Sequence, residues 1–478
     1  MNKVFKNYLY NLSYQLLIII LPLITTPYVS RVLGAKGVGT FGYTNSIVQY
    51  FILFGAIGLN IYGQREIAYH QQNKKEYSQL FWELFIVRIC TITISLFLFF
   101  WMSYEYTKYT YILYIQIIDI IASMIDISWF YQGIEDFKKI VIRNFFVKLT
   151  GVLFIFLFIK NSDDLYLYTF FHSFTLFLGN LSMWIYLPKI LVNINYKTLK
   201  FIPHLKSSLI LFIPQIAISL YTLLDKTMIG FLTNNEYEVG FYEQAQKIVK
   251  IALTLITSLG TVMMPRVANI YAQNDNQKVK EYMNHAFHFV FILGIPIMFG
   301  IIGITENLVP WFFGDGYEKV KLNMIIISPI ILFIGLSNVM GMQYLLPTAR
   351  QKQYTISVIL GSIFNFGLNL ILIPFFLSYG AAIATVCAEG IVTLAQFIFI
   401  RKDFDTKSIF KQSLKYFMYS LMMLISIIFI GKFIQSGVLC TIIQIICGII
   451  VYGTLLLITK DPLINDIITK RKKGENYE

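Results

Sequence analysis

The stretch SSLILFIPQIAISLYTLLDKTMIGFL, residues 207–232, indicates how this chain must fold. A helix needs about 20 mostly apolar residues to cross a bilayer, and this run is longer than that. It is not purely apolar, because Asp225 and Lys226 stand side by side near its end. Ionisable residues inside a span usually face protein or a water-filled cavity. The stretch therefore indicates both a membrane-spanning helix and a polar site.

The rest of the chain has the same character. Of its 478 residues, 56% are hydrophobic and only 14% are charged, and the mean hydropathy is +0.64. A soluble domain carries roughly 25% charged residues, so the composition predicts an all-α integral membrane protein. The apolar run at about 8–29 has no small-residue cleavage site. We therefore expect it to remain as the first span and not to act as a detachable signal peptide.

We assign fourteen hydrophobic segments as membrane-spanning helices with short connections. They cover approximately residues 8–29, 41–62, 80–101, 110–131, 142–160, 166–187, 207–231, 242–265, 285–305, 322–346, 355–376, 380–400, 412–431 and 437–459. If the N-terminus is cytoplasmic, 26 lysines and arginines fall in cytoplasmic segments and seven in outer ones. Because cytoplasmic loops are enriched in these residues, we expect both termini in the cytoplasm.

Two stretches of the chain resemble each other. VGTFGYTNSIV (38–48) and VGFYEQAQKIV (239–249) both begin Val-Gly, carry an aromatic residue at the same step and end Ile-Val. The same offset of 201 residues aligns Arg65 with Arg266. Both stretches open a span that leads inward, so the repeat predicts two parallel six-helix units.

The predicted units are an N-terminal bundle at 1–200 and a C-terminal bundle at 201–405. Residues 406–478 then form two extra transmembrane helices and a basic cytoplasmic tail. Parallel repeats of this kind are typical of secondary transporters, whose substrate site lies between the halves.

Several basic residues lie within or at the ends of the predicted spans. Lys247 and Lys250 share one helix face because they are three residues apart. Such residues either line a cationic cavity for an anionic group such as a phosphate, or extend towards lipid headgroups. Arg65 and Arg266, at the cytoplasmic ends of repeat-related spans, are either gate residues or ordinary positive-inside residues. The candidate cavity residues are Arg31, Lys226, Lys247, Lys250, Arg65, Arg266, Arg88 and Lys148.

Acidic residues inside the spans form a second set. Asp119 and Asp126 are seven apart on one helix face, with Arg88 and Lys148 at comparable depth on neighbouring spans. Ion pairing among these four is the economical interpretation, and a proton or cation relay is the alternative. Glu389, near mid-membrane, is either a coupling residue or a buried, protonated acid. The candidates for coupling or ion pairing are Asp225, Asp119, Asp126, Glu389 and Glu83.

Signatures of enzymes and metal proteins are not found in the sequence. It contains no P-loop, G-x-S-x-G or H-E-x-x-H motif. Glu281, His285 and His288 share a helix face, but a metal site needs more convergent ligands than these. We expect no catalytic residues, no metal site and no cofactor, apart from a coupling ion that is either H⁺ or Na⁺.

Two segments carry a resemblance to a known family. PYVSRVLGAKGVGTFGYTNSIVQYF (27–51), with GLNIYGQREIA (58–68), resembles the N-terminal signature of the polysaccharide transporter family, the Wzx-type flippases. DKTMIG (225–230), followed by residues 238–268, looks like the start of that family's second half. The fourteen-helix plan extends the resemblance over the full length of the chain.

The resemblance implies the fold of the MOP superfamily, two six-helix bundles in a V plus two helices. It also implies an alternating-access flippase, not an enzyme, that moves undecaprenyl-diphosphate-linked oligosaccharides to the outer leaflet for capsule, exopolysaccharide or O-antigen synthesis. A polysaccharide polymerase and other assembly proteins are the expected partners, and nucleic acid is not. A lipid II flippase of the same superfamily is the second interpretation. A MATE-type drug exporter, or a membrane glycosyltransferase or polymerase, fits less well.

Overall fold

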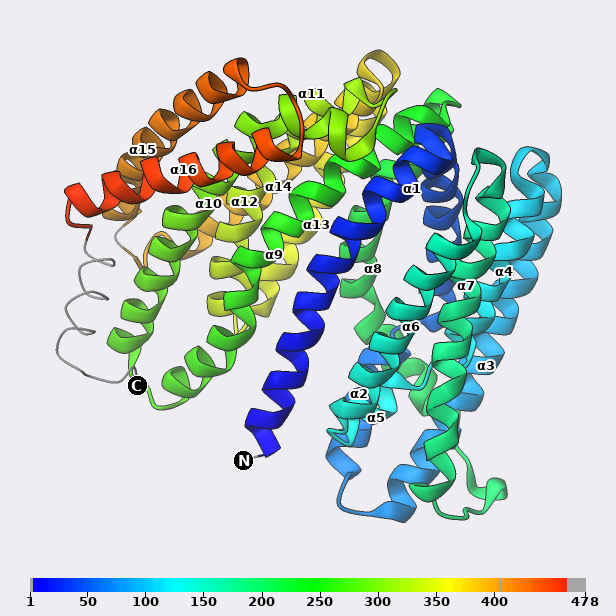
Figure 1. The fold of residues 1–478 in the computed structure, drawn as a ribbon. Helices are drawn as coiled ribbons and strands as arrows, with labels where there is room; N and C mark the ends of the chain where they lie inside the picture. The colour runs from blue at the N-terminus through cyan, green and yellow to red at the C-terminus, as the bar shows by residue number, and fades with distance from the viewer. Residues whose placement is uncertain (1–2, 405, 462–478) are drawn as a thin grey trace. The chain divides into compact units, whose positions relative to one another are not determined.

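The computed structural model describes residues 3–404 and 406–461, and every regular element within them is a helix (Figure 1). Within these described residues, ten helical segments are long and apolar enough to cross a membrane. The fourteen segments predicted from hydropathy all coincide with helical structure. The all-α membrane fold is therefore confirmed, whereas the exact number of spans stays a prediction. The chain forms two compact units, Met1–Glu243 and Gln244–Glu478.

The first unit begins with α1 (Lys3–Ala56), which contains two of the predicted spans. Its two helical arms meet at Gly34, whose φ of 65° and ψ of 175° are not helical. A positive φ is unfavourable for a residue with a Cβ, so glycine suits this turn. Figure 1 shows the chain climbing along the first arm and turning back at the top. The second arm continues into α2 (Leu59–His70).

The remaining helices of the first unit pack around this hairpin. They are α3 (Lys74–Glu105), α4 (Thr110–Met124), α5 (Ser128–Gly133), α6 (Phe137–Phe158), α7 (Leu165–Ser182), α8 (Ile202–Thr233) and the start of α9 (Glu236–Ala272). Short 3₁₀ turns lie at Thr107–Tyr109, Ser162–Asp164, Met183–Lys189 and Tyr196–Thr198. An aromatic core holds the end of the unit near α5, where Phe81 stacks on Trp129 and meets Phe130 edge-on.

The two glycines of the sequence repeat meet at a helix crossing in the first unit. A methyl group on Gly39 would overlap the backbone oxygen of Glu236, and one on Gly240 would overlap that of Ala35. Gly230 packs in the same manner against the ring of Tyr43. Small residues allow helix backbones to approach this closely in membranes. The repeat therefore marks a contact between the second arm of α1 and the start of α9.

The second unit comprises the rest of α9 and seven further α-helices. They are α10 (Asn276–Phe313), α11 (Glu318–Ile327), α12 (Ile330–Ser337), α13 (Gln351–Phe376), α14 (Ser378–Ile400), α15 (Thr406–Phe433) and α16 (Val438–Ile458). A π-helix, Asn338–Leu345, follows α12. The last two helices pack on α10, where the Tyr452 hydroxyl donates to the Ile292 carbonyl at 2.9 Å and Gly303 lies against Ile427. The predicted boundaries near residues 200 and 405 stay predictions.

Candidate functional site

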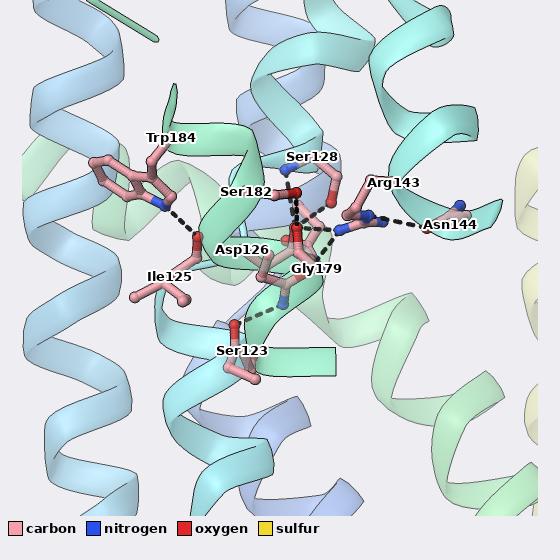
Figure 2. Close-up of polar contacts among 12 residues, drawn as sticks. Ser123, Ile125, Asp126, Ser128, Arg143, Asn144, Gly179, Ser182 and Trp184 are labelled. Carbon is pink, nitrogen blue, oxygen red and sulfur yellow. Dashed lines mark hydrogen bonds and ion pairs between the residues drawn. The ribbon is translucent and has the colours of Figure 1, made fainter. Parts of the chain in front are cut away.

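The fourth predicted span is broken, and polar side chains gather at the break (Figure 2). Between α4 and α5 the backbone of residues 125–127 leaves the helix and frees carbonyl groups. Asn180 Nδ2 donates to the Ala122 carbonyl at 2.8 Å. Trp184 Nε1 donates to the carbonyl of Ile125 at 2.8 Å (Figure 2). Non-helical backbone at membrane depth is tolerated where protein satisfies it in this way.

Arg88 from α3 closes the same break from the other side. Its Nε and Nη2 donate to the Ser123 carbonyl at 2.8 and 2.6 Å, and Nη1 donates to Asn60 Oδ1 at 2.6 Å. The residue is only 1% exposed, so its guanidinium is occupied by protein groups. This placement favours a structural role for Arg88 in holding the broken helix.

Asp126 lies at the centre of the cluster and has a basic partner that we did not single out from the sequence. Its carboxylate accepts from the Ser128 backbone N–H at 2.9 Å and lies 3.5 Å from Arg143 Nη1. Arg143 also donates to Asn180 Oδ1 at 2.6 Å and to Asn144 Oδ1 at 2.9 Å. The cluster thus joins α4, α6 and α7 through one guanidinium.

The pairing expected among Asp119, Asp126, Arg88 and Lys148 therefore does not form. Asp126 pairs with Arg143 instead, and Lys148 is exposed with no ion pair among the described residues. Asp119 is buried, with neither carboxyl oxygen hydrogen-bonded within the described part of the chain. The predicted pairing rested on the similar depth of these residues in the membrane. Which side chains meet also depends on how each helix is rotated about its axis.

Asp225 and Lys226 are adjacent on α8 and contact different residues of α9. This is expected because neighbouring side chains on a helix point about 100° apart. The Tyr242 hydroxyl donates to Asp225, while Lys226 Nζ lies 3.4 Å from Glu243 Oε2. This ammonium and carboxylate are close enough for an ion pair but are not aligned as a hydrogen bond. The expectation that the two residues are not each other's partner agrees with this geometry.

The remaining cavity candidates are divided between the two compact units. Arg31 is exposed just before the turn at Gly34 in the first unit. Lys247 is half-buried and Lys250 exposed on α9 in the second, where Lys250 Nζ donates to Gln246 Oε1 at 3.0 Å. Their convergence with Lys226 on one cavity stays a prediction.

The two repeat-related arginines lie beside tyrosine rings. Arg65 Nη2 is 2.9 Å from Glu66, and its guanidinium lies 5.4 Å from the Tyr62 ring centre. Arg266 is exposed and lies 4.7 Å from the centre of the Tyr282 ring. Cation–π contacts of this kind help to orient an arginine side chain.

Glu83 forms a buried network that the sequence did not indicate. Its carboxylate lies 2.8 Å from His204 Nε2, and His204 Nδ1 is 2.9 Å from the Tyr62 hydroxyl. The Lys200 backbone N–H and Gln79 Nε2 each lie 2.9 Å from the other oxygen of Glu83. This network joins α2, α3 and α8.

Glu389 lies on α14 in the second unit. It is 7% exposed, and its side chain is close enough to Tyr354 for the two groups to interact electrostatically.

The carboxyl group of Glu236, at the start of α9 and before the predicted span, has a shifted pKa. Burial opposes ionisation of Glu236, but hydrogen bonds from Lys108 and Tyr109 outweigh it and lower the pKa of the carboxyl. Lys108 Nζ lies 2.8 Å and the Tyr109 hydroxyl 2.6 Å from Glu236 Oε1. These contacts tie the turn between α3 and α4 to the start of α9.

A multi-pass helical chain with a polar broken span and buried charges defines a membrane transporter fold. A solved structure titled "Lipid II flippase MurJ, inward closed conformation" superposes with a TM-score of 0.71. It is 17% identical and covers 96% of this chain and 100% of its own. An inward-facing multidrug resistance MATE family transporter of the MOP superfamily superposes with a TM-score of 0.62 and 13% identity, covering 87% and 98%.

The family is shown by sequence. The model described as "Polysaccharide biosynthesis protein" matches residues 4–271, more than half of the chain, and the chain belongs to this family. The MatE model matches residues 211–372. The "Putative O-antigen transporter" of Escherichia coli K12 is 26% identical, covering 80% of this chain and 93% of its own. The "Probable low-salt glycan biosynthesis flippase Agl15" of Haloferax volcanii is 27% identical over 36% of each chain.

The resemblance inferred from the two signature segments is therefore confirmed, as is the MOP-like fold. The relatives are named as transporters and flippases, which agrees with the expectation of a transporter and not an enzyme. The residues that sequence reasoning missed are Asn60, Arg143, Asn180, His204 and Tyr242. An asparagine such as Asn180 inside an apolar run was the available signal, because polar residues within spans usually bond to protein.

Proposed function

We propose that this protein is a flippase for undecaprenyl-diphosphate-linked oligosaccharides in surface polysaccharide synthesis. The observation that carries the proposal is the family match, together with a relative named as an O-antigen transporter that aligns over 93% of its own length. The substrate unit moves from the inner to the outer leaflet of a bacterial cytoplasmic membrane, with both termini of the chain in the cytoplasm. A polysaccharide polymerase and other assembly proteins act on the delivered units.

An apolar groove in the second unit suits the lipid part of such a substrate. It has a volume of about 1160 Å³ and lies among α9, α10, α15 and α16. Its walls include Leu255, Leu293, Ile445 and Ile449. A polyprenyl chain reaches this groove from the bilayer and not from water, so it is held there by van der Waals packing against the apolar walls. The two C-terminal helices thus line a site for the lipid tail.

Basic and aromatic groups lie beside one end of the groove. Tyr282 and His285, near the start of α10, belong to its lining, and Arg266 lies over the Tyr282 ring. A lipid diphosphate has its charge at one end of an apolar chain, which matches a cation placed beside an apolar groove. Arg266 in this scheme guides the diphosphate while the tail enters the groove.

The headgroup then binds basic residues of the protein and is released by alternating access. Lys226 and Arg31 supply positive charge from the first unit, and Lys247 and Lys250 supply it from the second. An ion gradient or the membrane potential drives the cycle, since moving one charge through 100 mV is worth about 2.3 kcal/mol. The cargo leaves the cavity outside while its tail stays in the bilayer.

The test is the double variant Lys226→Gln and Lys247→Gln, measured in a strain whose own copy is deleted. We expect surface polysaccharide to be lost at an unchanged level of the protein, because two of the cations proposed to bind the headgroup are removed. The control neutralises two exposed lysines outside the proposed site, Lys36 and Lys432, one in each unit, and should export normally. Normal export by the first double variant would contradict the cationic site.

A lipid II flippase is the second candidate, favoured by the TM-score of 0.71 over 96% of this chain. The two candidates differ in the sugar attached to the same type of lipid diphosphate. Expression of this chain in cells depleted of their lipid II flippase distinguishes them. Restored growth would support the second candidate, whereas failure to restore growth, combined with restored surface polysaccharide in the deletion strain, supports the first.

A further inference from the structure

Three buried polar side chains lie on two neighbouring helices of the first unit without hydrogen-bond partners. Asp119 and Gln116 are on α4 and Ser173 is on α7, and their exposed fractions are 1%, 0% and 0%. No polar side-chain atom of the three is hydrogen-bonded to another described residue. Gln116 and Asp119 are three apart on one helix face, and the Ser173 hydroxyl on α7 lies close to the Asp119 carboxyl. They form a small polar cluster inside an apolar bundle.

The charged groups on the helices packed against α4 are engaged elsewhere. Arg88 on α3 is held by Ser123 and Asn60, and His172 on α7 packs edge-on against Phe41. In α1, the second arm carries Lys36 near the turn at Gly34, far along the helix from its centre. On α3, Glu83 is paired with His204, and the other charged residues, at Lys74, Lys75, Glu76 and Glu105, lie in the end turns.

An unpaired carboxylate in such surroundings is strongly disfavoured. Removing an ion from water costs several kcal/mol even after relaxation, and no cation is placed to offset that cost. A bound metal ion would need more ligands, and the described residues contain no group of three or more acidic, histidine or cysteine side chains that could hold one. A proton on the carboxyl removes the charge and provides a donor for the neighbouring oxygens.

We propose that Asp119 is protonated in this state and is the proton-carrying group that couples transport in the flippase proposed above. The carboxyl binds one proton from water on one side of the membrane, forming one O–H bond. In the other state of the cycle that bond breaks, and the proton passes to water on the opposite side. No other bond changes, so the step balances as the movement of one proton.

Asp119 lies close along α4 to the contact between Arg88 and Ser123, so its ionisation can affect the broken span. Ser123 is four residues further along α4, so it lies one turn away on the same face. The Ser123 carbonyl is the acceptor for Arg88, so Arg88 is the cation that holds this end of α4. When Asp119 loses its proton, the carboxylate competes with Ser123 for this guanidinium. Proton release therefore weakens the contact that holds the break between α4 and α5.

The test compares the wild type with Asp119→Asn by infrared spectroscopy of the purified protein in lipid. We expect a carbonyl band of a protonated carboxylic acid that is present at neutral pH and missing in the variant. Asp163→Asn, which makes the same change at an exposed loop position, is the control and should keep the band. A spectrum in which the band survives in Asp119→Asn overturns the proposal.

Thermal unfolding gives a second readout. The wild-type midpoint should fall more steeply with rising pH than that of Asp119→Asn, because the folded state holds a proton that the unfolded chain releases. The series is repeated with and without Na⁺. A Na⁺-dependent rise in the midpoint that disappears in Asp119→Asn would overturn the proton assignment in favour of a metal ion.

Two further arms keep the proposal testable. If Asp119→Asn is not recovered as folded protein, Ser173→Ala carries the test. It should shift the frequency of the band by removing the neighbouring hydroxyl, and an unshifted band overturns the proposal. The spectroscopic tests need no substrate. Their failure is therefore distinguishable from failure of the flippase assignment, which rests on surface polysaccharide in the lysine variants.

Discussion

At the residue scale, several buried polar groups of this protein are satisfied by groups distant in sequence. Arg88 binds a carbonyl 35 residues away, Asn180 one 58 residues away, and His204 meets Glu83 across 121 residues. Each is a contact between different helices, made where burial would otherwise leave a polar group without a partner. Removing one partner of such a contact costs the desolvation of the other.

Asn180 provides a test of this view because its amide serves two groups at the helix break. Asn180→Ala leaves the Ala122 carbonyl and the Arg143 guanidinium each short of a partner. We expect the free energy of unfolding to fall by about 1–3 kcal/mol for each group left unsatisfied, measured as a lower thermal midpoint in detergent.

Asn144→Ala is the matched control for this variant. Asn144 also accepts from Arg143, at 2.9 Å, but it is half-buried, so water can replace it at less cost. A loss of stability in Asn144→Ala as large as that in Asn180→Ala would contradict the structural role of the break.

At the element scale, close helix crossings are built from the glycines of the sequence repeat. Gly39 on the second arm of α1 meets the start of α9, and Gly240 on α9 meets α1 at Ala35. The repeat was recognised from its Val-Gly pairs and aromatic residues. Its physical meaning is an approach between backbones that leaves no room for a Cβ atom.

Alanine at either crossing glycine should therefore destabilise the protein. Gly39→Ala and Gly240→Ala each force backbone to move, and overpacking of this kind costs about 1–3 kcal/mol or more. The measurement is the thermal midpoint and the yield of monodisperse protein.

Gly367→Ala on α13 is the control, because a Cβ there meets nothing within 4 Å. That variant should be neutral or gain about 0.5–1 kcal/mol from the better helix propensity of alanine. Equal behaviour of Gly39→Ala and Gly367→Ala would show that the crossing is not as tight as described.

At the scale of the molecule, the proposed cycle combines a lipid groove, a cationic cavity and a proton site. The groove belongs to the second unit and the proton site to the first, so transport requires coupling along the chain between them. The proposed route on the first unit runs from Asp119 through Arg88 to the break in the fourth predicted span. The groove offers an independent point at which to interrupt the cycle.

Gly453 on α16 lines the groove, and a Cβ there meets nothing within 4 Å. Gly453→Phe should place a ring in the groove without disturbing the packing, and should reduce surface polysaccharide severalfold at normal protein level. Gly367→Phe puts the same ring into open space on α13, outside the groove, and should export normally. Equal export by the two variants would argue against the groove as the lipid site.

By itself the sequence determined the membrane fold, the helical segments, the repeat and the family. These depend on hydrophobic runs, charge bias and short motifs, which are local along the chain and are set by the bilayer as a solvent. The tertiary structure alone decided that Arg88 closes a helix break, that Asp126 pairs with Arg143, and that Asp119 is left unpaired. The reason is that side-chain partners depend on how each helix is rotated against its neighbours, and hydropathy carries little information about that rotation.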